Sequence, residues 1–261
     1  MFLLQCCLVL VAPAMLFALT IHFLERLVQA RMSRRFGWKS VLWTAWLGTP
    51  IHELSHALMC VVFRHRIEKM ALFEPDFDSG RLGYVQHSYR KDSLFQEIGN
   101  AFIGIAPLAG GTLVLLIAMR IFYPGVLTES MEAGSADAGL IGQVFTMTTT
   151  MMTKVFSQGL ANWQTWLFLY IILCVGSHMA PSMTDYQGGR KGGLILLLFF
   201  VIGAFLIGLF VPAEMSLAEA TAPYLAPLLA VYGMVILLVT VASLVIVIFT
   251  GLWDFIPFAG P

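Results

Sequence analysis

The feature that most constrains this chain is a long apolar run, residues 41–63, that carries the pentapeptide HELSH at residues 52–56. In a helix, positions four apart lie on one face, so His52 and His56 can bind one metal ion while Glu53 stands beside it. The alternative is a pair of packed histidines and a glutamate that fall in register by chance. Placing ionisable side chains in a segment apolar enough to cross a membrane costs free energy, so such residues usually have a function. We therefore predict a metal site with an adjacent base.

The whole chain has the composition of a membrane protein. Hydrophobic residues make up 59% of its 261 residues and charged residues only 11%, with a mean hydropathy of +0.83, whereas soluble domains carry roughly one-quarter charged residues. We expect an integral, multi-pass protein of a bacterial cell membrane, with the lipid bilayer as one partner. The net charge of zero gives no indication of nucleic acid binding. The four cysteines lack CxxC spacing, so neither a thiolate zinc site nor a disulfide framework is indicated.

Six apolar segments are long enough for transmembrane helices, since about 20 residues cross the hydrocarbon core. Between the second and third segments lies the most polar region, residues 64–98, in which strand-like pieces at 69–73 and 81–89 flank a turn-rich stretch. The expected fold class is an all-α membrane protein with about six transmembrane helices and a small membrane-associated β-hairpin. The expected spans are about 1–24, 41–63, 100–123, 163–179, 193–211 and 224–252.

A hydrolytic zinc site takes three protein ligands and keeps a fourth position for water, so His52 and His56 need one more donor. The proline four residues before Asp185 should break a helix there. Asp185 also lies at the side of the membrane where the HELSH helix ends, at a depth similar to that of His56. We predict Asp185 as the third ligand. The alternatives are that Asp185 faces water or pairs with Arg190, or that His178 is the ligand.

Four segments together resemble the site-2 protease family of intramembrane zinc metalloproteases, which is M50-like. They are the HELSH helix, the strand-like segment after it, the small-residue stretch GIAPLAG at 104–110, and residues 181–190, in which Asp185 follows a proline and precedes two glycines. The resemblance covers about residues 40–192 and implies a three-helix metalloprotease core. Two residues separate Asp185 from the glycine that usually follows the family's aspartate directly, and glycine replaces an asparagine usual in the second core helix. The chain resembles a divergent member.

The resemblance implies a zinc-dependent metallopeptidase that hydrolyses peptide bonds of transmembrane protein substrates in or near the bilayer. It assigns His52, His56 and Asp185 as zinc ligands and Glu53 as the catalytic base. Zn²⁺ lowers the pKa of bound water, and Glu53 accepts the released proton. A helical substrate must be unwound before attack, and the predicted hairpin can hold it extended by strand addition.

The expected organisation has three parts. Residues 1–39 form a first transmembrane helix with a basic juxtamembrane segment, 40–192 the catalytic core, and 193–261 the C-terminal transmembrane helices. Two other functional classes stay open, a non-proteolytic zinc-binding membrane protein such as a pseudoprotease or sensor, and a transporter with a metal site. Retention of Glu53 argues against the first, and the lack of an internal repeat argues against the second.

Overall fold

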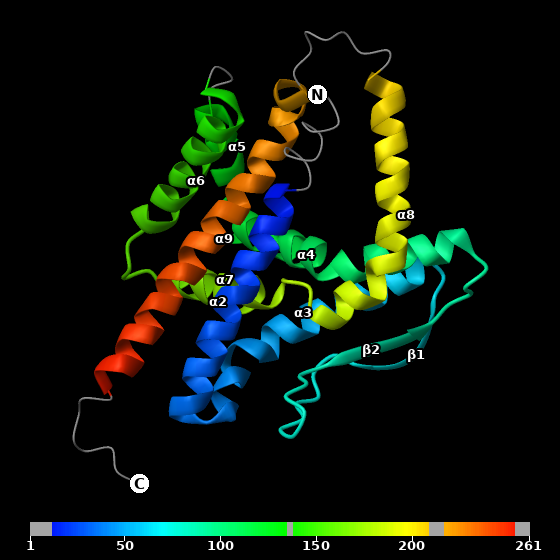
Figure 1. Ribbon diagram of the computed structural model, residues 1–261. Helices are drawn as coiled ribbons and strands as arrows, with labels where there is room; N and C mark the ends of the chain where they lie inside the picture. The colour runs from blue at the N-terminus through cyan, green and yellow to red at the C-terminus, as the bar shows by residue number, and fades with distance from the viewer. Residues whose placement is uncertain (1–11, 135–137, 209–216, 254–261) are drawn as a thin grey trace.

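The structure is a computed structural model that describes residues 12–134, 138–208 and 217–253. Within these ranges the chain is mostly helical with one two-stranded sheet (Figure 1). The start of the expected first span and the end of the expected fifth lie outside the described residues. The elements are α2 (Ala12–Phe36), η2 (Trp38–Val41), α3 (Leu42–Val62), β1 (Arg66–Ala71), β2 (Tyr84–Ser88), α4 (Leu94–Phe122), α5 (Val126–Ala133), α6 (Gly139–Ser157), α7 (Trp163–His178), α8 (Met183–Gly208) and α9 (Leu217–Trp253).

Two of the described helices are long and apolar enough to cross a membrane, α4 over its whole length and α9 over Pro223–Gly251. α7 and α8 pass the same test only as a pair that is bent by 60°, which makes one broken span or a re-entrant loop. These findings are consistent with a membrane protein, but the expected six crossings are not confirmed. The polar residues of the HELSH motif lower the hydropathy of α3, and the basic residues near 31–35 do the same for α2.

Two helix boundaries differ from the sequence-based expectation. α2 continues through the expected juxtamembrane segment and ends only before Gly37, whose φ of 76° the helix cannot adopt. α4 begins at Leu94, earlier than expected, because Ser93 accepts a hydrogen bond from the Gln96 N–H and caps the helix. The signature Ser-x-x-Gln before an apolar run would have predicted that start.

The main core lies where α4, α6 and α7 pack with α9 and the beginning of α2. Phe17 of α2 stacks on Tyr232 of α9 with ring centroids 4.1 Å apart. A Met- and Thr-rich stretch, residues 146–153, lies within α6. Met147, Met151 and Val155 of α6 recur every four residues and are buried against this core. Figure 1 shows α6 and α9 side by side, away from the hairpin.

Small residues hold α3 tightly between two other helices. A Cβ at Gly110 of α4 would lie 2.0 Å from Ser55 Oγ, inside the HELSH motif. A Cβ at Gly48 would lie 2.3 Å from the Cys174 carbonyl oxygen of α7. The helix that carries the small-residue stretch 104–110 thus approaches the motif helix closely, and α3 packs mainly on α4 and α7.

α8 crosses α4 with its backbone in direct contact. A Cβ at Gly192 would lie 2.2 Å from the Glu97 carbonyl oxygen, and a Cβ at Gly104 would lie 2.8 Å from the Asp185 carbonyl oxygen. The crossing therefore fixes the first turns of α8 against α4.

The predicted hairpin is confirmed, with shifted strand boundaries. β1 and β2 pair antiparallel, with Met70 opposite Val85. The loop between them packs on η2, where Phe77 and Trp38 have ring centroids 4.7 Å apart. Figure 1 shows the hairpin at the edge of the helical body, beside α3 and the start of α8.

The α4 and α8 crossing should depend on Gly192 and not on its neighbour. We expect Gly192→Ala to destabilise the protein by about 1 to 3 kcal/mol, because its methyl group would meet backbone. Gly193→Ala is the matched control, because a Cβ there has no atom within 4 Å, and alanine is the better helix former. Thermal unfolding of both purified variants in detergent measures the difference. Equal melting temperatures would refute the close contact.

Candidate metal centre

The HELSH motif places its two histidines on one face of α3, and two backbone carbonyls orient their rings. His52 Nδ1 lies 2.7 Å from the His178 carbonyl oxygen, and His56 Nδ1 lies 2.7 Å from the Ile103 carbonyl oxygen. A carbonyl only accepts, so both Nδ1 atoms carry hydrogen and donate. In the neutral rings both Nε2 atoms then bear lone pairs. Histidines that bind a metal through one ring nitrogen usually donate a hydrogen bond from the other nitrogen to a carbonyl or carboxylate, as Nδ1 does here.

The two Nε2 atoms face each other at 3.1 Å. Two lone pairs at this distance repel, and a cation between them, either a metal ion or a proton, removes the repulsion. The structure brings Asp185 to the same point. Its Oδ1 lies 3.3 Å from His56 Nε2, and its Oδ2 lies 3.6 Å from His52 Nε2. One atom from each of these three residues lies within 4.8 Å of the others.

The separations of His56 Nε2 from His52 Nε2 (3.1 Å) and from Asp185 Oδ1 (3.3 Å) suit a tetrahedral metal ion, whereas the 3.6 Å to His52 Nε2 is measured from the other carboxylate oxygen, Oδ2. With bonds of about 2.0 to 2.1 Å, the ligand atoms of tetrahedral zinc lie roughly 3.3 Å from one another. His52, His56 and Asp185, called the metal group below, are thus able to hold a metal ion. Two imidazoles and one carboxylate form a donor set that suits zinc and leaves a fourth position open. Their role as ligands stays a prediction.

Asp185 is held in place by the start of α8. The chain leaves the helical path after His178 and resumes it at Met183, as expected from Pro181. Ser182 donates to Asp185 Oδ2 through its backbone N–H (2.7 Å) and its hydroxyl (2.6 Å), and the Asp185 N–H donates back to Ser182 Oγ (3.2 Å). This is a capping box. It leaves Oδ1 directed at His56 without another hydrogen bond among the described residues.

The structure favours neither alternative to Asp185 as the third member of the group. Asp185 faces the histidines, and no ion pair with Arg190 is found in the described part of the chain. The His178 ring is buried, with Nδ1 3.0 Å from the Cys174 carbonyl oxygen and 3.0 Å from Ser177 Oγ. It is not part of the group that can hold a metal. His178 contributes its backbone carbonyl, which orients His52.

Glu53 lies beside this group and is buried, yet its carboxylate forms no hydrogen bond or ion pair with any described residue. The hairpin covers it. A Cβ at Gly83 would lie 2.8 Å from Glu53 Cγ, so only glycine lets the chain pass this close. Glu53 shares a cavity of about 340 Å³ with His52, His56 and Asp185. A carboxylate free of partners inside the same cavity is available to accept a proton.

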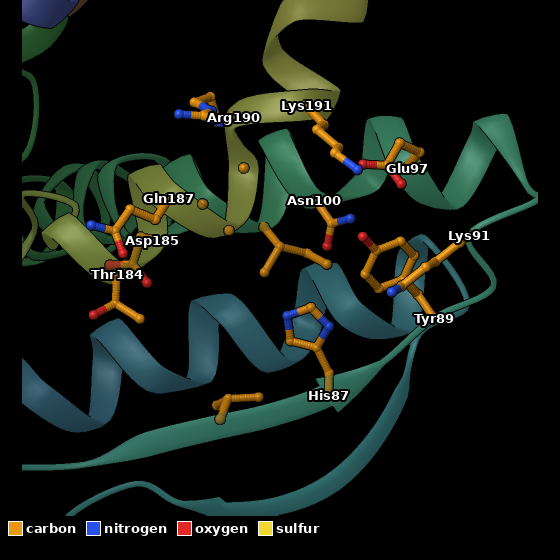
Figure 2. Close-up of a pocket in the computed structure, with 15 residues that line it drawn as sticks. His87, Tyr89, Lys91, Glu97, Asn100, Thr184, Asp185, Gln187, Arg190 and Lys191 are labelled. Atoms are coloured by element: carbon orange, nitrogen blue, oxygen red, sulfur yellow. The ribbon is translucent and has the colours of Figure 1, made fainter.

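A larger cavity of about 610 Å³, called the outer cavity below, extends from Asp185 (Figure 2). One side is β2 and the others are the first turns of α4 and α8. Figure 2 shows basic side chains at its outer part and His87 between that part and Asp185. The polar and charged residues around it are His87, Tyr89, Lys91, Glu97, Asn100, Thr184, Gln187, Arg190 and Lys191.

Sequence reasoning missed several residues that build the centre. Ser182 had a signal, since Ser-x-x-Asp is a capping signature. Gly83, Ile103 and His87 had none, because a backbone carbonyl or a close approach depends on which segments meet. The chain matches no known family model, no curated protein and no solved structure.

The assignment of the third ligand can be tested by metal content. We expect Asp185→Asn to lose most of the zinc of the purified protein, because the carboxylate supplies both a ligand and compensating charge. His178→Asn is the matched control and should retain the metal, since only its backbone contacts His52. Full zinc in the Asp185 variant together with none in the His178 variant would reverse the assignment.

Proposed function

We propose that this protein is an intramembrane zinc metalloprotease and a divergent member of the site-2 protease family. One observation carries the proposal: His52, His56 and Asp185 converge at zinc-like separations in a cavity that also holds the unpaired Glu53. A site that only binds metal has no use for a free carboxylate at that place. The combination of an oriented metal group and a base is what metal-assisted hydrolysis requires.

The proposal gives each residue a role. His52, His56 and Asp185 would hold Zn²⁺, which as a Lewis acid favours attack of water on a peptide carbonyl. Glu53 accepts a proton from the attacking water as the new C–O bond forms. It returns that proton to the amine nitrogen as the C–N bond breaks, so protons balance over the cycle. The hairpin covers Glu53, with Gly83 against its side chain.

The proposed substrate is a transmembrane protein whose chain is extended at the cleavage site. A helix hides its carbonyls in its own hydrogen bonds, so a cleavable segment must unwind. The two cavities beside β2 support this, because a strand along their wall can hold an extended chain. We also propose that α3, α4 and α8 form the three-helix core, in a multi-pass protein of a bacterial cell membrane with further crossings beyond α4 and α9.

The test is to replace the base and retain the metal group. We expect Glu53→Gln to reduce peptide hydrolysis by about 10²- to 10⁴-fold, while zinc content stays near that of the unaltered protein. Membrane fractions of cells that express either form are compared for new protein N-termini, and metal is measured on the purified proteins.

Glu129→Gln is the control, because Glu129 lies on α5 and pairs with Lys154. It should leave cleavage unchanged. Cleavage products that persist in the Glu53 variant would rule out this mechanism. Zinc in the unaltered protein without any cleavage product would favour a non-proteolytic zinc-binding protein.

A further inference from the structure

His87 of β2 lies between the two cavities of the candidate centre and lines both of them. Figure 2 shows its ring rising from β2 toward α4, with one ring nitrogen on the side of Asp185 and the other on the side of Tyr89. His87 does not belong to the group that can hold a metal. A chain that passes from the outer cavity to the metal group therefore passes His87.

A chain of hydrogen bonds fixes where the hydrogen of His87 sits. His65 is buried, and its Nε2 lies 2.9 Å from the Gln96 carbonyl oxygen, so this nitrogen carries hydrogen and donates. The other nitrogen, His65 Nδ1, lies 3.0 Å from His87 Nδ1. In a neutral His65 ring, Nδ1 bears a lone pair and accepts. His87 Nδ1 must then carry the hydrogen, and His87 Nε2 bears a lone pair.

Both rings are held in their neutral forms. Burial lowers the pKa of His65 below its ordinary value. Burial also lowers the pKa of His87, and a charge on the neighbouring His65 or His56 would lower it further. At neutral pH, His87 Nε2 is consequently a hydrogen-bond acceptor. It has no donor among the described residues, although it sits in a cavity wall beside the metal group.

We propose that His87 Nε2 accepts a hydrogen bond from a backbone N–H of the polypeptide that enters the metal centre. This inference rests on the proposed function and adds a substrate-binding residue to it. A backbone N–H is the donor that every polypeptide offers in an extended conformation, whatever its sequence. His87 projects from β2 into the cavity wall. The backbone N–H groups of an extended chain in this cavity form no hydrogen bonds within their own chain, so one of them is free to donate to this nitrogen.

The test compares two zinc-binding probes on the purified zinc-loaded protein in detergent. Acetohydroxamate contacts the metal alone, and an apolar tripeptide hydroxamate adds backbone N–H groups. We expect His87→Phe to weaken the tripeptide probe about three- to tenfold, the range of one hydrogen bond, and to leave acetohydroxamate unchanged. Gln86→Ala is the matched control, because Gln86 is the exposed neighbour on the opposite face of β2.

A second series locates the bond. N-methylation of each amide of the tripeptide probe removes one N–H at a time. One methylated probe should bind the unaltered protein three- to tenfold more weakly and bind the His87→Phe protein no more weakly than its parent. Equal losses for both proteins at every position, or equal loss of acetohydroxamate and the tripeptide probe in His87→Phe, would overturn the proposal.

A measurement on the unaltered protein does not depend on any variant folding. Nitrogen-15 chemical shifts of labelled histidine should show His87 protonated at Nδ1 and unprotonated at Nε2. The reverse tautomer would overturn the inference while leaving the proposed protease intact. Failure of the unaltered protein to bind either hydroxamate would instead contradict the zinc centre itself, and with it this inference.

Discussion

Two backbone carbonyls determine what this structure is able to do. The carbonyl oxygens of His178 and Ile103 accept hydrogen bonds from the Nδ1–H groups of His52 and His56. Both Nε2 lone pairs therefore point to one place. Neither carbonyl belongs to α3. One comes from the end of α7 and the other from α4, so the metal group exists only while these helices flank α3. The glycines at the helix contacts are therefore part of the site, since they set the distances at which the carbonyls reach the rings.

Glu53 lines cavities on two sides, one beside β2 and one beside α2. On one side lie the two cavities that meet at His87 and Asp185. On the other lies a cavity of about 350 Å³ lined in part by α2, with Thr49 and His178 in its wall. Thr49 Oγ1 and His178 Nε2 are buried there without a hydrogen-bond partner among the described residues. Buried polar atoms beside a polar cavity are normally satisfied by water, so this side suits the supply of water to Glu53.

The hairpin connects these features. Its loop packs on Trp38, Gly83 lies against Glu53, and His87 lines both cavities beside Asp185. At its other end, His65 follows α3 directly and hydrogen-bonds to the first turn of α4. The polar region between the second and third apolar segments is thus folded onto the site. The segment that lies against Glu53 at Gly83 continues directly into β2, which carries His87.

The sequence by itself determined the local parts of the site. The spacing of His52 and His56 places both residues on one helical face, and Pro181 predicts a break in the helix before Asp185. Apolar composition determined the membrane class, and turn residues determined the hairpin. These are consequences of backbone geometry within a few residues.

The tertiary structure decided the rest: which carbonyls orient the histidines, that Asp185 and not His178 completes the group, that α6 is core, and that His87 faces the cavity. The expected six crossings are not confirmed, since α7 and α8 pass the test for a membrane span only as a bent pair. Each of the features that the tertiary structure decided depends on contacts between segments far apart in the chain, which periodicity along one segment does not specify.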